Sequence, residues 1–121
     1  MDIHEYNGKA LFAQYGIPVP KSEVVVNADE ALAAIQKMDM DRVVVKAQVH
    51  AGGRGKAGGV RITDNKNDLV NAVKSMIGQR LVTYQTTAEG QPIHKVLIEE
   101  PCDIDRELYL GAVIDRCKQR I

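Results

Sequence analysis

The chain has 121 residues, of which 45% are hydrophobic and 26% charged, and its formal net charge at pH 7 is +0. These values fit one small globular domain, or part of a larger one, and exclude a disordered chain. The balanced charge argues against a protein that acts on nucleic acid or anionic membranes, since such proteins carry a basic excess. The sequence has no membrane-length apolar run and no signal-peptide pattern at its start, so we expect a cytoplasmic protein.

Cysteines and histidines give no sign of a metal or catalytic site. Cys102 and Cys117 lack the spacing of metal ligands, so we expect free thiols. His4, His50 and His94 are dispersed along the chain. We therefore predict no catalytic residue and no metal ligand in this sequence.

Helical and strand patterns alternate along the chain. Apolar spacing, capping pairs and β-branched runs predict helices over residues 3–15, 27–38 and 65–76, and strands over 22–26, 42–48, 60–63, 80–84, 94–100 and 106–115. Asn27 with Glu30, and Asn65 with Asp68, are the expected helix caps. This alternation predicts an α/β or α+β fold with a mixed sheet.

The first predicted helix has apolar residues on more than one side. Ile3, Tyr6, Ala10 and Ala13 share a face, whereas Leu11, Phe12 and Tyr15 lie off it. Such a helix is expected to be buried from several directions, either against another lobe or subunit or as an ordinary core helix.

The most informative stretch begins with the lysine that ends a valine-rich strand. Lys46 follows Val43–Val45 and precedes a glycine-rich loop that carries Arg54 and Lys56. Glycines allow backbone N–H groups to close on an anion, and three cations around one loop favour phosphate. The alternative is a mobile hairpin tip whose basic residues serve only solubility.

Two familiar phosphate motifs do not fit this loop. Residues 53–58 match G-x-G-x-x-G by letter, but a strand pattern follows them where a dinucleotide fingerprint requires a helix. A Walker A loop fails as well, because Ala57 follows Lys56 and Ala51 occupies the upstream glycine position. What remains is a glycine-rich turn between two strands that covers phosphates, as in protein kinases.

A second group of polar residues follows the strand predicted over residues 94–100. It comprises Glu99, Glu100, Cys102, Asp103, Asp105 and Glu107. These side chains could bind Mg²⁺, accept hydrogen bonds from ribose hydroxyls, or face water. The basic loop favours the ribose interpretation, because a nucleotide needs cations at its phosphates and acceptors at its sugar.

Several stretches together resemble the β subunit of succinyl-CoA synthetase, namely residues 3–18, 45–60, 81–86 and 107–112. The resemblance implies an ATP-grasp fold and an enzyme of the tricarboxylic acid cycle that couples succinyl-CoA formation from succinate and CoA to ATP/ADP phosphoryl transfer. It implies an α subunit as partner, in an αβ or α2β2 complex, that carries the phosphohistidine. It also implies an N-terminal helix and linker (1–20), a first ATP-grasp lobe (21–102) and the start of a second lobe (103–121).

The resemblance further implies roles for individual residues. Lys46 would contact the nucleotide phosphates, and the covering loop would be formed by Gly53, Arg54 and Gly55. Glu99 and the backbone of Cys102 would lie at the base-binding hinge, and Glu107 would bind the ribose. The Mg²⁺ ligands and the CoA-ligase domain would lie downstream of residue 121, so we expect an N-terminal fragment that alone binds nucleotide weakly and has no ligase activity.

Three alternatives stay open on the sequence alone. The chain could belong to a malate-specific homologue or to ATP-citrate lyase, which share this lobe. It could instead be a non-catalytic module that binds a partner through its first helix and an unfinished strand. The preference for adenine or guanine nucleotides is also undecided, although Pro20, near the expected base site, is more typical of ADP-forming than of GDP-forming members.

Overall fold

The computed structural model describes residues 3–121, so Met1 and Asp2, which we assigned to the N-terminal unit, lie outside the described residues. In chain order the elements are α1 (Glu5–Gln14), β1 (Ser22–Val25), α2 (Ala28–Met38), β2 (Val43–Ala47), β3 (Val60–Thr63), α3 (Lys66–Met76), β4 (Arg80–Leu81), β5 (Gln91–Pro92) and β6 (Val96–Glu99). The predicted α+β class is confirmed.

The main sheet has four strands in the order β1-β6-β2-β3. All three neighbouring pairs are antiparallel, a more uniform arrangement than the mixed sheet we expected. β2 and β6 are therefore the central strands, and each of them has a partner on both sides. The short β4 and β5 form a separate two-stranded sheet.

Both helices that follow a strand begin at the predicted asparagine. The side chain of Asn27 accepts a hydrogen bond of 2.8 Å from the backbone N–H of Glu30, and Asn65 accepts one of 2.9 Å from Asp68. Each asparagine satisfies an N–H group that would otherwise lack a partner in the first helical turn. Local sequence thus sets where α2 and α3 begin.

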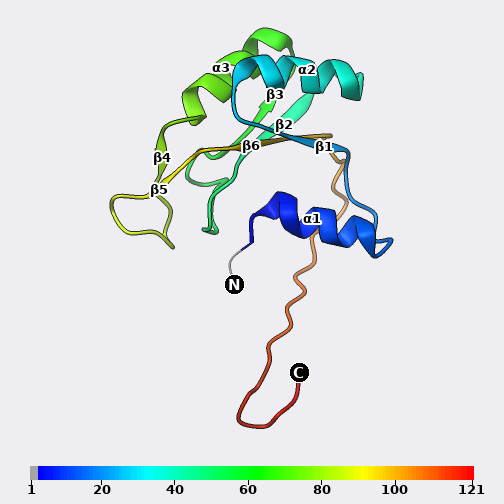
Figure 1. The fold of residues 1–121 in the computed structure, drawn as a ribbon, viewed down its shortest axis with the longest axis vertical. Helices are drawn as coiled ribbons and strands as arrows, with labels where there is room; N and C mark the ends of the chain where they lie inside the picture. Colours follow the sequence, from blue (N-terminus) through cyan, green and yellow to red (C-terminus); the bar gives the residue numbers. More distant parts are fainter. Residues whose placement is uncertain (1–2) are drawn as a thin grey trace.

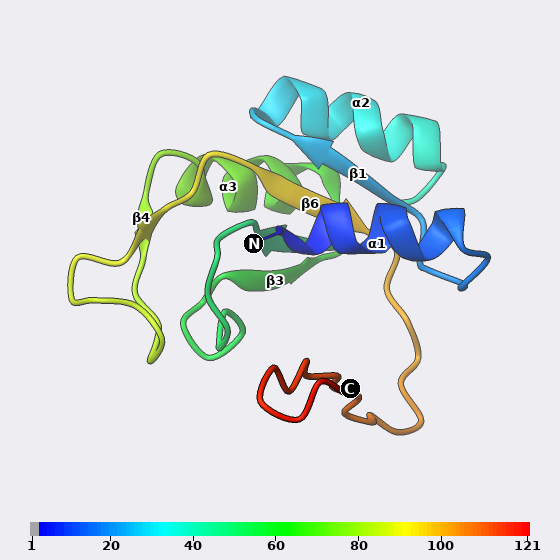
Figure 2. The ribbon, with the colours of Figure 1, turned by 60° about the horizontal axis from the view of Figure 1, so that its bottom comes forward.

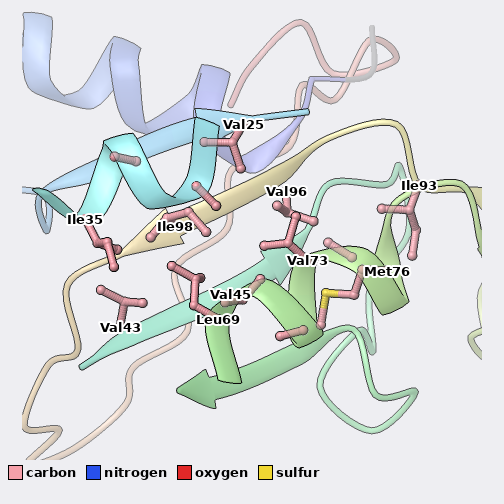
Figure 3. Packing of buried hydrophobic residues seen from close by; sticks show 14 of the residues in the cluster. Val25, Ile35, Val43, Val45, Leu69, Val73, Met76, Ile93, Val96 and Ile98 are labelled. Atoms are coloured by element: carbon pink, nitrogen blue, oxygen red, sulfur yellow. The ribbon is translucent and has the colours of Figure 1, made fainter. Parts of the chain in front are cut away.

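α2 and α3 cover one face of the main sheet and bury the core against it (Figure 1). Figure 3 shows the side chains of both helices directed at β2 and β6. The largest fully buried side chains of this core are Ile35, Leu69, Ile98, Val43, Val45, Val73 and Val96, whereas Leu97, opposite Lys46 in the register, is buried on the other face. Because side chains alternate across a strand, every second residue of β2 enters this core and the others face away from it.

α1 lies on the side of the sheet away from α2 and α3 (Figure 1). The alternative of an ordinary core helix is wrong for the described chain, since no residue of α1 is buried, and burial against another lobe or subunit stays a prediction. Tyr15, just after the helix, is 83% exposed, and Leu11 and Phe12 are also exposed. Ion pairs of Glu5 and Lys9 connect α1 to the sheet.

Two predicted strands are corrected by the structure. The strand over 80–84 is limited to Arg80 and Leu81, and residues 106–115 form no strand apart from an isolated bridge between Asp115 and Arg120. The segment after β6 extends away from the main sheet and α1 (Figure 2). A strand pattern needs a neighbouring strand to satisfy its backbone groups, and the described chain places none beside residues 106–114.

No helix among residues 3–121 has the length and apolar character that a membrane span requires.

Candidate phosphate-binding site

The position of Lys46 follows from the alternation of side chains along β2. Val45 and Ala47, its neighbours in the strand, are buried in the core. Lys46 must therefore project from the opposite face, on the side where α1 lies. The lysine that the sequence singles out is thus held on a central strand of the sheet.

Glu99, at the end of β6, lies beside Lys46 on the same face. In the register of the two strands Glu99 is opposite Val44, two residues from Lys46. Glu99 is only 3% exposed, and its carboxylate forms ion pairs with Lys46 and with Lys9 of α1. Two cations offset the hydration that this carboxylate loses on burial.

Glu5, the first residue of α1, forms ion pairs with three cations. Its Oε1 atom is 3.1 Å from the Lys9 ammonium and 3.3 Å from that of Lys46, and its Oε2 accepts a 2.7 Å hydrogen bond from Arg54 Nη2. We call Glu5, Lys9, Lys46, Arg54 and Glu99 the charge cluster. It joins α1, both central strands and the glycine-rich loop at one place.

The charge cluster favours the ionised forms of Glu5 and Lys46. Burial by itself would raise the pKa of the Glu5 carboxyl, but Arg54, Lys46 and Lys9 outweigh it and lower this pKa to about 2. Burial would likewise lower the pKa of Lys46, but the hydrogen bond to Glu99 and the charges of Glu5 and Glu99 raise it.

The glycine-rich loop, residues 48–59, connects β2 to β3 as predicted. Its base is closed by a hydrogen bond of 2.8 Å from the Ala47 N–H to the Gly59 carbonyl. Gly53 has φ +75°, and a Cβ atom there would lie 2.4 Å from the Tyr84 ring. Only glycine combines this backbone conformation with so close a neighbour.

Residues between β4 and β5 support this loop. The Gly52 N–H donates a 2.5 Å hydrogen bond to Gln85 Oε1, and the Tyr84 ring lies against Gly53. Near the start of the loop, His50 stacks on His4 with ring centroids 3.9 Å apart. The loop is therefore attached both to the 82–90 segment and to the start of α1.

A cleft of about 870 Å³ opens between the loop and the N-terminal end of α1. It is lined by residues 49–56 of the loop, and by Ile3, Glu5, Val60, Tyr84 and Gln85. Its size falls within the range of small-molecule sites. Arg54 and Lys56 supply positive charge, and the glycines leave loop backbone near the open space, so the cleft suits a phosphorylated ligand.

The structure brings together five of the seven site residues named from the resemblance. Lys46, Arg54 and Glu99 belong to the charge cluster, and Gly53, Arg54 and Gly55 line the cleft. Cys102 and Glu107 are exposed on the segment after β6, and neither side chain forms a hydrogen bond or ion pair within residues 3–121. The roles of all seven stay predictions.

Residues 3–121 contain no group of three or more His, Cys, Asp or Glu side chains placed to hold a metal ion. The acidic residues after β6 are therefore not gathered into a magnesium site in the described chain.

Sequence reasoning missed the roles of Glu5 and Lys9. Their partners are distant in the chain, 41 residues away for Glu5 with Lys46 and 90 residues away for Lys9 with Glu99. One local signal exists, because Glu5 and Lys9 form an i,i+4 pair on the first helix. That pair alone indicates an exposed helix face rather than a binding site.

Comparison with known proteins gives consistent matches over the whole chain. A family model described as an ATP-grasp domain matches residues 2–121. The chain is 62% identical over 121 residues to succinate–CoA ligase (ADP-forming) subunit beta of Coxiella burnetii strain CbuG_Q212, and 54% identical to the protein of the same name from Pseudomonas aeruginosa strain UCBPP-PA14. Each match covers 100% of this chain but 31% of the relative. The resemblance expected from the sequence is confirmed.

Proposed function

The chain belongs to the ATP-grasp domain family, and on this basis we propose that it is the phosphate-binding lobe of the β subunit of an ADP-forming succinate–CoA ligase. The observation that carries this proposal is Arg54 at the wall of a glycine-rich cleft, with Lys46 connected to it through Glu5. Phosphoryl transfer depends mainly on positioning and on charge neutralisation, and these residues can supply both at the nucleotide phosphates.

Within this function Lys46 and Arg54 neutralise phosphate oxygens, and Gly53 and Gly55 let the loop backbone approach them. Lys46 stands on a central strand and Arg54 is fixed by a 2.8 Å hydrogen bond from its Nη1 to the Ala47 carbonyl. Both cations are thereby positioned before a ligand arrives, which reduces the entropy lost on binding. Glu99, Cys102 and Glu107 complete the proposed nucleotide site on the base and ribose side.

The substrates and partner follow from the names of the relatives. Those names specify a subunit, a succinate–CoA ligase and ADP as product, which supports succinate over malate or citrate, ATP over GTP, and an α subunit as partner. Mg²⁺ and CoA would take part in the reaction of the whole complex. A cytoplasmic location completes the proposal.

Replacing Lys46 in the complete β subunit, assembled with its α subunit, tests the proposal. We expect Lys46→Ala to lower ATP-dependent succinyl-CoA formation at least about 100-fold, because a positioned charge at the phosphates is lost. Lys37→Ala is the matched control, since Lys37 pairs with Glu23 on the surface. Unchanged turnover in a folded Lys46→Ala complex would refute the assignment, and faster turnover with malate or citrate than with succinate would refute the substrate.

A further inference from the structure

Glu5 stands between the cleft and Lys46. Glu5 and Arg54 line the cleft, whereas Lys46 is not among the lining residues although its ammonium is 3.3 Å from the Glu5 carboxylate. A phosphate that enters the cleft therefore meets Glu5 and Arg54 before it can contact Lys46. For Lys46 to bind phosphate directly, the Glu5 carboxylate has to move.

The Glu5 carboxylate occupies the donors that an anionic ligand needs. Its two oxygens contact the Lys9 and Lys46 ammonium groups and the Arg54 guanidinium. A carboxylate that accepts from lysine and arginine in this way resembles a bound phosphate in charge and geometry. Together with Glu99, it leaves the three cations with little net positive charge.

Neither Lys46 nor Arg54 depends on Glu5 alone for its position. Lys46 is also paired with Glu99, and Arg54 also donates to the Ala47 carbonyl at 2.8 Å. Loss of the Glu5 charge therefore leaves both cations anchored while removing a negative charge next to them. The expected result is stronger attraction for an incoming polyanion.

We propose that Glu5 is an internal placeholder for the nucleotide phosphates, which a polyphosphate chain must displace from Lys46 and Arg54. The inference rests on the proposed nucleotide-binding function and adds a specificity-determining residue to it. Displacement favours ligands that carry several phosphate charges, since only they replace all the contacts that Glu5 gives up.

Calorimetric titration of the complete β subunit, assembled with its α subunit, tests the placeholder. The probes are ATP, inorganic tripolyphosphate and adenosine. We expect Glu5→Gln to lower the Kd of ATP and of tripolyphosphate about tenfold, and to leave that of adenosine within about twofold, because only the phosphates compete with the carboxylate. If Glu5 contributed only to folding, Glu5→Gln would change the Kd values of tripolyphosphate and adenosine to the same extent.

The control is Glu23→Gln, which removes a carboxylate paired with Lys37 outside the charge cluster and is expected to leave all three Kd values unchanged. Unchanged or weaker binding of ATP and tripolyphosphate by a folded Glu5→Gln protein overturns the placeholder. If Glu5→Gln does not fold, Glu5→Asp decides. The aspartate side chain is one methylene shorter and reaches the cations less well. A decrease in the Kd of ATP and tripolyphosphate smaller than the change of about tenfold expected of Glu5→Gln supports the placeholder, and unchanged Kd values overturn it.

The outcomes also separate this inference from the proposed function. ATP binding that is lost in Lys46→Ala but not tightened in Glu5→Gln overturns only the placeholder. A native complex that binds neither ATP nor tripolyphosphate overturns both.

Discussion

Lys46 and Glu99 stand on the two central strands of the sheet, and their side chains form an ion pair on the face opposite the core. The carboxylate is nearly inaccessible to water, and its second partner, Lys9, comes from a helix 90 residues away. This pair links the sheet to α1 and fixes the lysine on which the proposed function depends.

Replacing Glu99 should destabilise the protein. Glu99→Gln removes one of the two carboxylates that Lys9 and Lys46 share, the other being Glu5, so we expect the free energy of unfolding to fall by about 1–3 kcal/mol. Urea denaturation followed by circular dichroism measures the change. Glu100→Gln is the control, because Glu100 accepts only a 3.3 Å hydrogen bond from the Lys21 N–H. Equal unfolding free energies for the two variants would contradict the structural role of the pair.

Glu5 should make the free energy of unfolding depend on pH in the acidic range. Its pKa in the folded protein is about 2, below the ordinary glutamate value of 4.5, so its stabilising contribution is present above pH 4.5 and is lost as the pH falls toward 2. With allowance for partial solvent exposure, we expect a contribution of about 1–2 kcal/mol. Urea titrations at several pH values between about 2 and 6 should show a shallower pH dependence in Glu5→Gln. The same slope in both proteins would contradict this prediction.

His4 should add a second pH dependence nearer neutrality. Burial lowers the pKa of His4 from the ordinary histidine value of 6.5, and the neighbouring His50, Lys95 and Arg54 lower it further. The unfolded chain then binds the proton more readily, so stability is full above pH 6.5 and decreases as the pH falls through the folded-state pKa. We expect His4→Gln to reduce the pH dependence of the unfolding free energy below pH 6.5. His94→Gln, at an exposed position, is the control and should leave the slope unchanged.

Gly53 should tolerate no side chain. Alanine there would require φ +75° and a Cβ atom 2.4 Å from the Tyr84 ring, so we expect Gly53→Ala to cost about 1–3 kcal/mol and to weaken ATP binding. Gly55→Ala is the control for stability alone, because no atom of the described chain lies within 4 Å of the position that its Cβ would take. Adding Tyr84→Ala to Gly53→Ala removes the collision but not the backbone strain, and should restore only part of the loss. Full restoration would show that strain at Gly53 contributes nothing.

Local sequence accounts for most of the helices and strands and for half of the candidate site. Asn27 and Asn65 mark the starts of α2 and α3, and the alternation of buried valines in β2 directs Lys46 away from the core. The position of Lys46 before a glycine-rich loop indicates phosphate binding, because charge density and backbone access are properties of a short continuous stretch.

Which charges meet depends on the folded arrangement of distant segments. Glu5 and Lys9 contact Lys46, Arg54 and Glu99 because α1 packs across the sheet. No local pattern determines where a helix packs when a linker joins it to the rest of the fold. The same limit explains the error over residues 106–115, where an apolar run predicts a strand but the described chain gives it no partner. A strand is defined by hydrogen bonds to a neighbour, and the position of a helix by contacts across the fold, so neither can be read from one stretch of sequence.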